Sequence, residues 1–200
     1  STKALSEARE LGDSTSVREA YLAIEQITYF YNSDDSLAMT YNRLVSDSWD
    51  NREQAHQSVR ALNNRFNYNL SPDDVRDIIE RSEAICEEYG FDDLLINIYL
   101  NASFQELSFE DIEASARYLA LAEPLVDNYK DEGYYYSAKG FHNLFAGNNE
   151  EAIKALRHSV ELLGDGDFDS KNVHSYFLWQ DIYHAMGRDS EAYDALMAFA

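Results

Sequence analysis

The sequence predicts an all-α protein, and three observations support this fold class. Nearly every segment of the 200 residues carries apolar residues at helical spacing, and only short polar stretches separate one segment from the next. The chain contains 2 Pro and 8 Gly, too few for a turn-rich β-sandwich. One pattern also recurs: a glycine turn, acidic residues and a small alanine in "GNNEEAIKAL" (147–156) return in "GRDSEAYDAL" (187–196).

The helices are expected in a regular order with short turns between them. The helix over 72–89 has the clearest start, because "LSPDDV" supplies Ser71 as a cap, Pro72 at the first helical position and acidic residues in the first turn. Gly12 and Gly90 are expected to end the helices before them. The full set of predicted helices is 3–11, 16–31, 34–47, 51–66, 72–89, 92–106, 110–128, 131–146, 149–163, 171–186 and 189–199.

The helices also recur as pairs. The distance between Gly12 and Gly90 corresponds to about two units of a period near 34–40 residues, which is typical of helical solenoids. The segment "GNNEEAIKALRHSVELL" (147–163) resembles the second helix of a tetratricopeptide repeat (TPR). Ala152 stands where the family's paired helices approach closely, and Gly140 occupies the small position of the first helix.

The resemblance to the TPR family is clearer in residues 92–200 than in the degenerate repeats of residues 1–91. It implies a right-handed superhelical solenoid of antiparallel helix pairs, with about five pairs in a single domain over 1–200. The segment "STKALSEARELGD" resembles the last helix of a preceding repeat, and "EAYDALMAFA" stops within an apolar helix. Since solenoids usually end in polar capping helices, we expect the sequence to be part of a larger protein.

Composition narrows the classes of partner. A hydrophobic fraction of 45% with 15 Tyr and 10 Phe is typical of a folded protein. The formal net charge of −21, spread evenly along the chain, opposes binding to nucleic acid and to anionic membrane surfaces. No apolar run approaches the ~18–20 residues of a membrane span. A single cysteine excludes an internal disulfide framework, which suits either the cytosol or the periplasm.

Motifs for catalysis and cofactors are missing from the sequence: it has no phosphate-binding glycine loop, no dinucleotide fingerprint and no nucleophile elbow. Cys86 lies on the apolar face of a predicted helix beside Glu87 and Glu88, which would raise its pKa, so we expect a buried structural thiol. None of the histidines has a partner at metal-ligand spacing, and packing or surface roles are expected for them. They are His56, His142, His158, His174 and His184.

One stretch offers a weak metal candidate. Asp165, Asp167 and Asp169 of "DGDFDS" alternate as in a calcium loop, but Ser170 replaces the sharp-turn glycine and Tyr176 replaces the bidentate glutamate. A solvated loop between helices is the favoured interpretation, and no metal or cofactor is expected.

The repeat frame of the TPR resemblance also implies a concave groove lined by the first helices. Aromatic and amide side chains along such a groove suit an extended peptide or a helix, although several of them could simply fill a tight superhelix. The implied groove residues are Arg60, Asn64, Asn97, Leu100, Phe104, Tyr134, Ser137, Phe141, His174, Phe177, Asp181 and His184.

Arg60 and Asn64 resemble the first pair with which some TPR domains clamp a peptide's C-terminal carboxylate. The bases needed two repeats later are replaced by Tyr134 and Ala138, so the clamp is incomplete.

The sequence therefore favours a non-catalytic scaffold that binds a protein, a peptide or a small-molecule signal, with a homodimer as a further expectation. The segments "ARELGD" and "AICEEYGFDDLLINIYLNAS" resemble arrays in the sensor regions of membrane-anchored bacterial signalling proteins such as diguanylate cyclases and histidine kinases. That resemblance implies a periplasmic location. A cytosolic adaptor or peptide-responsive regulator is the alternative, and an enzyme is the least favoured hypothesis.

Overall fold

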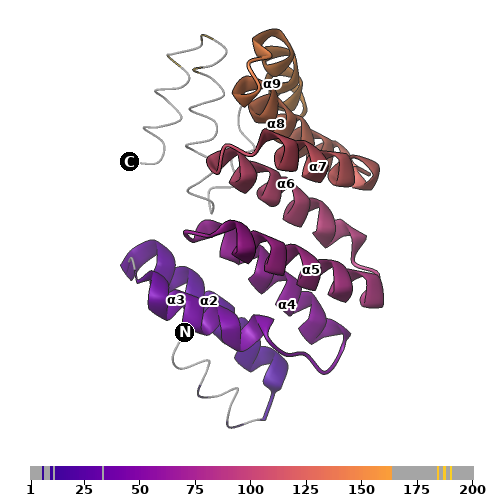
Figure 1. Cartoon of the computed structure of the whole chain (residues 1–200). Coiled ribbons are helices and arrows are strands. Elements are labelled where there is room, and N and C mark those ends of the chain that lie inside the picture. The colour runs from indigo at the N-terminus through magenta and orange to yellow at the C-terminus, as the bar shows by residue number, and fades with distance from the viewer. Residues whose placement is uncertain are drawn as a thin grey trace. The chain divides into compact units, whose positions relative to one another are not determined.

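The computed structural model describes residues 12–32 and 34–163, together with Ser6, Glu10, His184, Gly187 and Ser190. The predicted all-α class is confirmed, since the described residues form helices and no strand (Figure 1). The α-helices are α2 (Ser14–Asn32), α3 (Asp35–Ser46), α4 (Arg52–Asn64), α5 (Pro72–Tyr89), α6 (Asp92–Ser108), α7 (Ile112–Ala122), α8 (Tyr129–Phe145) and α9 (Asn149–Leu163). Two 3₁₀ turns follow α4 and α7: η1 (Arg65–Asn67) and η2 (Glu123–Leu125).

The chain forms two compact units, Ser1–Gln105 and Glu106–Ala200. In the first unit α2 packs against α3, α3 against α4, and α4 against α5, while α2 also touches α4 (Figure 1). A small apolar cluster of Leu22, Val45 and Ala61, with Tyr21 packed against it, joins α2, α3 and α4. The first helices of successive pairs, α2 and α4, therefore lie side by side.

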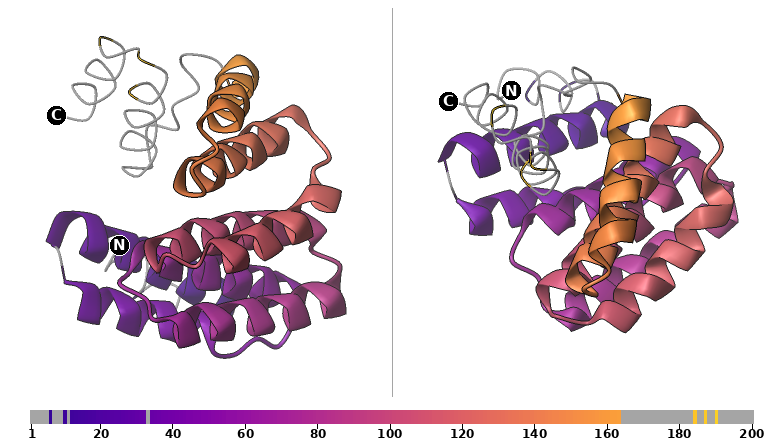
Figure 2. Two further views of the ribbon diagram at one scale, coloured as in Figure 1. Left: turned by 45° about the horizontal axis from the view of Figure 1, so that its top comes forward. Right: turned by 90° about the horizontal axis from the view of Figure 1, so that it is seen from above.

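In the second unit α8 packs closely against α9, and α7 packs against α8 (Figure 2). Gly140 explains the close approach of α8 and α9, because a Cβ atom added there would lie 2.5 Å from Cδ2 of the fully buried Leu156. Ala152 is also buried. The small residues that the repeat pattern predicts at this contact, Gly140 and Ala152, are therefore both buried, and Gly140 faces Leu156 of α9.

Local capping signals position the helix ends. Ser71 and Asp74 form a reciprocal capping box at the start of α5, with Pro72 at the first helical position, and Gly90 ends the helix in the left-handed conformation at φ 69°. The predicted bounds 72–89 and 149–163 are confirmed. At the start of α2 the Asp13 carboxylate accepts the Ser16 N–H, so this helix begins two residues earlier than predicted.

Two predicted helices end early and continue as 3₁₀ turns. The helix expected over 110–128 ends at Ala122, because Pro124 has no N–H to continue the helical ladder, and a 3₁₀ turn follows. The helix expected over 51–66 ends at Asn64 and continues as η1. Nearly all of the predicted helices 3–11, 171–186 and 189–199 lies outside the described residues. Within the described ranges, no helix is long and apolar enough to cross a membrane.

The capping box supplies a first test. Replacing Ser71 by alanine removes the acceptor of the Asp74 N–H and the donor to Asp74 Oδ2, so we expect a loss of about 1 kcal/mol in unfolding free energy by urea titration. Ser36→Ala, an exposed serine in the first turn of α3, is the control and should stay within about 0.5 kcal/mol of the wild type. Equal losses from the two variants would contradict the capping role.

Candidate functional site

A row of polar side chains crosses α2, α4 and α6 in the first unit. Arg60 Nη1 on α4 lies 3.1 Å from Glu19 Oε1 on α2, and the two side chains are 45% and 48% exposed. Gln57 Nε2 on α4 donates to the same Glu19 oxygen at 2.9 Å. On the other side of α4, Asn101 of α6 donates to Asn63 Oδ1 at 2.9 Å. Side-chain hydrogen bonds therefore link the first helices of successive pairs across one polar face.

The implied groove residues differ widely in exposure. In the first unit Arg60 and Asn97 are exposed, Asn64 and Phe104 are half-buried, and Leu100 is buried. Asn64 Nδ2 is held by the buried Glu25 at 3.0 Å, so Arg60 and Asn64 both contact glutamates of α2.

In the second unit Ser137 and Phe141 are buried and Tyr134 is half-buried. His184 is helical and exposed, whereas His174, Phe177 and Asp181 lie outside the described residues. Among the described groove residues, Arg60 of α4, Asn97 of α6 and His184 are therefore exposed.

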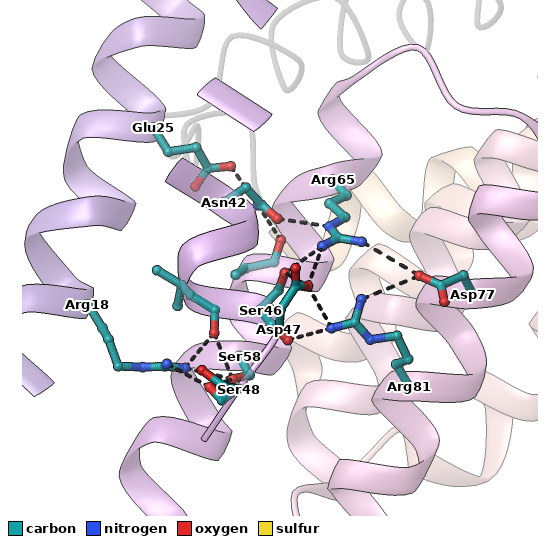
Figure 3. A network of polar contacts seen from close by, with 12 residues as sticks. Arg18, Glu25, Asn42, Ser46, Asp47, Ser48, Ser58, Arg65, Asp77 and Arg81 are labelled. Atoms are coloured by element: carbon teal, nitrogen blue, oxygen red, sulfur yellow. Dashed lines mark hydrogen bonds and ion pairs between the residues drawn. The ribbon is translucent and has the colours of Figure 1, made fainter. Parts of the chain in front are cut away.

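A buried polar network that the sequence reasoning missed lies beside this row (Figure 3). At its centre is Glu25 of α2, which is only 1% exposed. Its Oε1 accepts from Asn42 Nδ2 of α3 at 2.8 Å and from the Tyr68 hydroxyl at 2.9 Å, and its Oε2 accepts from Asn64 of α4. Burial raises the pKa of Glu25, and the three donors only partly offset this effect.

Arg18 forms the second part of the network. Its guanidinium is buried and donates to the backbone oxygens of Val45 at 2.5 Å, Ser48 at 2.6 Å and Gln54 at 3.0 Å. It also donates to Gln57 Oε1 at 3.0 Å and Ser58 Oγ at 2.7 Å. The carbonyl groups of Val45 and Ser48 belong to the carboxyl end of α3 and the turn after it, where the helix dipole favours a cation. Hydrogen bonds from Arg18 thus connect α2 to the carboxyl end of α3 and to α4.

The third part is an alternating cluster of two arginines and two aspartates (Figure 3). Asp47 Oδ1 lies 3.2 Å from Arg65 and 3.0 Å from Arg81, and Asp77 Oδ2 lies 3.6 Å and 3.5 Å from the same two side chains. Although burial alone would raise it, hydrogen bonds from Arg81 and Ser46 hold the pKa of Asp47 below its ordinary value. Arg65 also donates to Asn42 Oδ1 at 2.9 Å, which connects this cluster to Glu25.

One signal in the sequence could have revealed the network. Arg18, Leu22, Glu25 and Tyr29 follow one another at helical spacing, so two charged residues share a stripe of α2 with an apolar and an aromatic residue. Charges on such a stripe predict buried, hydrogen-bonded partners.

In the second unit, polar contacts are centred on His158 of α9. Its Nε2 lies 3.1 Å from Glu132 Oε1 of α8, and the Tyr136 ring meets the imidazole edge-to-face at 4.4 Å between centroids. Tyr136 thus packs within the pair formed by α8 and α9. His142 lies 3.2 Å from Ser115 Oγ of α7, and burial lowers its pKa. These contacts join α7, α8 and α9.

The described residues contain no group of three or more His, Cys, Asp and Glu side chains arranged to hold a metal ion. The weak candidate of Asp165, Asp167 and Asp169 lies outside the described residues. Cys86 is buried, and its pKa is raised to about 12 by burial and, to a smaller extent, by Asp93 and Asp92. The expected direction is confirmed, but the contributing acids are Asp92 and Asp93 instead of the sequence neighbours Glu87 and Glu88.

The polar row on α2, α4 and α6 is therefore the candidate functional site, and the buried network supports its helices. Comparison of the chain with protein-family models, curated proteins and solved structures gave no match.

Proposed function

We propose that the chain is a non-catalytic, TPR-like scaffold that binds a protein or peptide on the face formed by its first helices. The proposed architecture is a right-handed superhelical solenoid of about five helix pairs. The observation that carries the proposal is the row of polar side chains across α2, α4 and α6, where Arg60 and Asn97 are exposed and Asn101 meets Asn63. A repeated helical face of this kind suits an elongated partner.

The chemistry of the row supports a peptide as the ligand. Amide side chains both donate and accept hydrogen bonds, so Asn97 and Asn101 can pair with a peptide backbone. The Arg60–Glu19 pair is about half exposed, and exposed pairs contribute only ~0–1 kcal/mol, so a ligand can replace this contact at little cost. Arg60 then offers a planar guanidinium to a ligand carboxylate or carbonyl group.

We further propose that the scaffold is the sensor region of a membrane-anchored bacterial signalling protein, located in the periplasm and acting on an attached effector. Binding would bias the effector only if the ligand prefers one curvature or one arrangement of two protomers. The alternative is a cytosolic adaptor or peptide-responsive regulator. Reading the parent gene separates the two, because a membrane helix and a signalling domain after Ala200 support the sensor, and a cytosolic chain supports the adaptor.

Binding can be tested with phage-displayed random peptides selected on the 200-residue chain, followed by calorimetry of the most enriched synthetic peptide. We expect Arg60→Ala and Asn97→Ala each to weaken binding about tenfold, which corresponds to ~1.4 kcal/mol. Arg76→Ala is the matched control, since this exposed arginine lies on α5, outside the polar row, and pairs only with Asp73 of its own helix. Its affinity should stay within about twofold of the wild type.

An enriched peptide whose affinity is the same in all three variants would place binding elsewhere on the chain. If a saturating concentration of that peptide leaves the small-angle scattering curve unchanged, the proposed transmission through curvature or dimerisation is wrong, even where binding itself is retained.

A further inference from the structure

The junction between the pair α2–α3 and the pair α4–α5 combines apolar packing with buried polar contacts. One of its apolar clusters consists of Leu22, Val45 and Ala61 with Tyr21. Around this cluster lie the buried side chains of Arg18, Glu25, Asn42 and Arg65. Apolar contacts tolerate small shifts, whereas a buried polar group is stable only while its hydrogen bonds are complete.

Glu25 connects more segments than any other carboxylate of this junction. Its three donors come from α3 (Asn42), α4 (Asn64) and the segment after η1 (Tyr68). Asn42 in turn donates to the Ala61 carbonyl at 2.6 Å and accepts from Arg65. Separation of α2–α3 from α4 would therefore break the Asn64, Tyr68 and Ala61 bonds together, and would bring Glu25 into contact with water.

We infer that this junction is a pH-dependent hinge, at which α2 and α3 detach together from α4–α5 and then unfold, so that their amides exchange with solvent, and that the protonation of Glu25 sets how often this occurs. The inference does not rest on the proposed ligand binding, because it uses only the contacts of the buried Glu25 and no ligand.

Among the described residues, the charged or titratable groups that act on Glu25 or on its partner Tyr68 are Tyr29, Asp35 and Arg65. Tyr68 touches the carboxylate directly, and its own pKa is raised by burial and by Glu25, so its hydroxyl remains a donor. Arg65 of η1 reaches Glu25 only through Asn42, and its charge slightly favours the carboxylate form. Tyr29 of α2 packs on Tyr68 at 5.1 Å between ring centroids. Burial and, to a smaller extent, the negative charge of Asp35 on α3 raise the pKa of Tyr29, and Asp35 adds a minor contribution to the raised pKa of Tyr68. The partners from α3 and α4, Asn42 and Asn64, do not titrate.

The direction of the pH effect follows from the raised pKa of Glu25. The closed junction binds a proton more tightly than the open one, in which the carboxyl group regains the ordinary glutamate pKa of 4.5. Glu25 therefore stabilises the closed junction most below pH 4.5. This contribution to stability is lost as the pH rises from 4.5 through the raised pKa of Glu25. The lowered pKa of Asp47 acts in the opposite direction, but only in more acidic solution.

Hydrogen exchange measured by mass spectrometry on the whole chain, between pH 4.5 and 8, tests this hinge. The quantity of interest is the ratio of exchange rates in the wild type and in Glu25→Gln, because the ratio removes the intrinsic pH dependence of exchange. For amides of α2 and α3 we expect the ratio to rise with pH, at most tenfold per pH unit since one proton is linked, and then to level off. Amides of α5 should keep a constant ratio.

A further variant sharpens the experiment. Tyr68→Phe removes one donor that favours the charged form of Glu25, and it should extend the rising part of the curve to higher pH. This variant is compared directly with the wild type if circular dichroism shows that Glu25→Gln does not fold.

A ratio for α2 and α3 that stays constant over this pH range would show that Glu25 does not control opening. The hinge is also excluded if the α5 amides follow the same curve, because the first unit would then open as a whole.

Discussion

Replacing Arg18 by methionine is expected to lower the free energy of unfolding of the first unit by about 3–5 kcal/mol. The methionine fills much of the space but donates no hydrogen bond. The backbone oxygens of Val45, Ser48 and Gln54 would each lose the donor that Arg18 supplies, and the Ser58 hydroxyl, which is also within hydrogen-bonding distance of all three, can donate to one of them at a time. A buried acceptor left without a partner costs ~1–3 kcal/mol. Because small domains are stable by only ~5–15 kcal/mol, this single change removes much of the total.

Urea unfolding followed by the fluorescence of Trp49, which lies in the turn between α3 and α4, measures the loss in the first unit. Arg76→Met is the matched control. Its guanidinium is 61% exposed and pairs only with Asp73, so its loss should be below about 1 kcal/mol. Arg18→Lys should fall between the two, since an ammonium group cannot reach acceptors spread around a planar guanidinium. A loss in Arg18→Met no larger than in Arg76→Met would show that the network does not stabilise the unit.

Local signals in the sequence predicted most of the helices, because helix ends depend on residues close in the chain. The α5 helix shows this: Ser71, Pro72 and Gly90 act on the backbone within one turn, and the predicted bounds agree with the structure. The sequence predicts that the helix beginning at residue 110 continues to residue 128, because the apolar pattern runs through Leu125 and Val126. In the structure α7 ends at Ala122, before Pro124. The spacing of apolar residues alone does not show where the backbone hydrogen bonds of a helix end.

The contacts of the candidate site are harder to predict from the sequence than the helices are. Arg60 and Asn64 were assigned to a groove from their repeat positions, but the frame could not show that Glu19 and Glu25 of another helix contact them. In this unit polar side chains form hydrogen bonds with partners about 40 residues away along the chain, as Arg18 does with Ser58. Helical periodicity fixes the face on which such a residue lies, and the tertiary packing then decides whether it meets water or a buried acceptor.

The two units hold their helix pairs together by different physical means. In the first unit buried arginines and a buried glutamate join α2, α3 and α4, so its stability depends on protonation and on complete hydrogen bonding. In the second unit α8 and α9 approach closely where Gly133 faces Leu163 and Gly140 faces Leu156, and the His158–Glu132 contact lies between the same two helices. The packing of the second unit is therefore expected to be sensitive to side-chain volume at these glycines.

Gly140→Val is accordingly expected to lower the free energy of unfolding of the second unit by about 3 kcal/mol. A Cβ atom at this position would lie 2.5 Å from Leu156 Cδ2, 2.6 Å from Leu156 Cγ and 3.3 Å from the Leu156 backbone nitrogen. Leu156 is fully buried. Overpacking of this kind costs ~1–3 kcal/mol or more. Gly140→Ala should lose less, about 1–2 kcal/mol, because alanine regains ~0.5–1 kcal/mol of helix propensity.

A double-mutant cycle separates the steric clash from other effects of the substitution. Leu156→Ala alone should cost about 2–5 kcal/mol through the cavity that it leaves. For the double variant Gly140→Ala with Leu156→Ala, the total loss of unfolding free energy should be smaller than the sum of the two single losses by ~1–3 kcal/mol, because the shortened side chain leaves room for the new methyl group. Ala116→Val on the exposed side of α7 is the control for helix propensity and should cost about 0.5 kcal/mol. Additive losses would mean that Gly140 is required for some reason other than the close approach of Leu156, and the glycine would then no longer explain how α8 and α9 pack so closely.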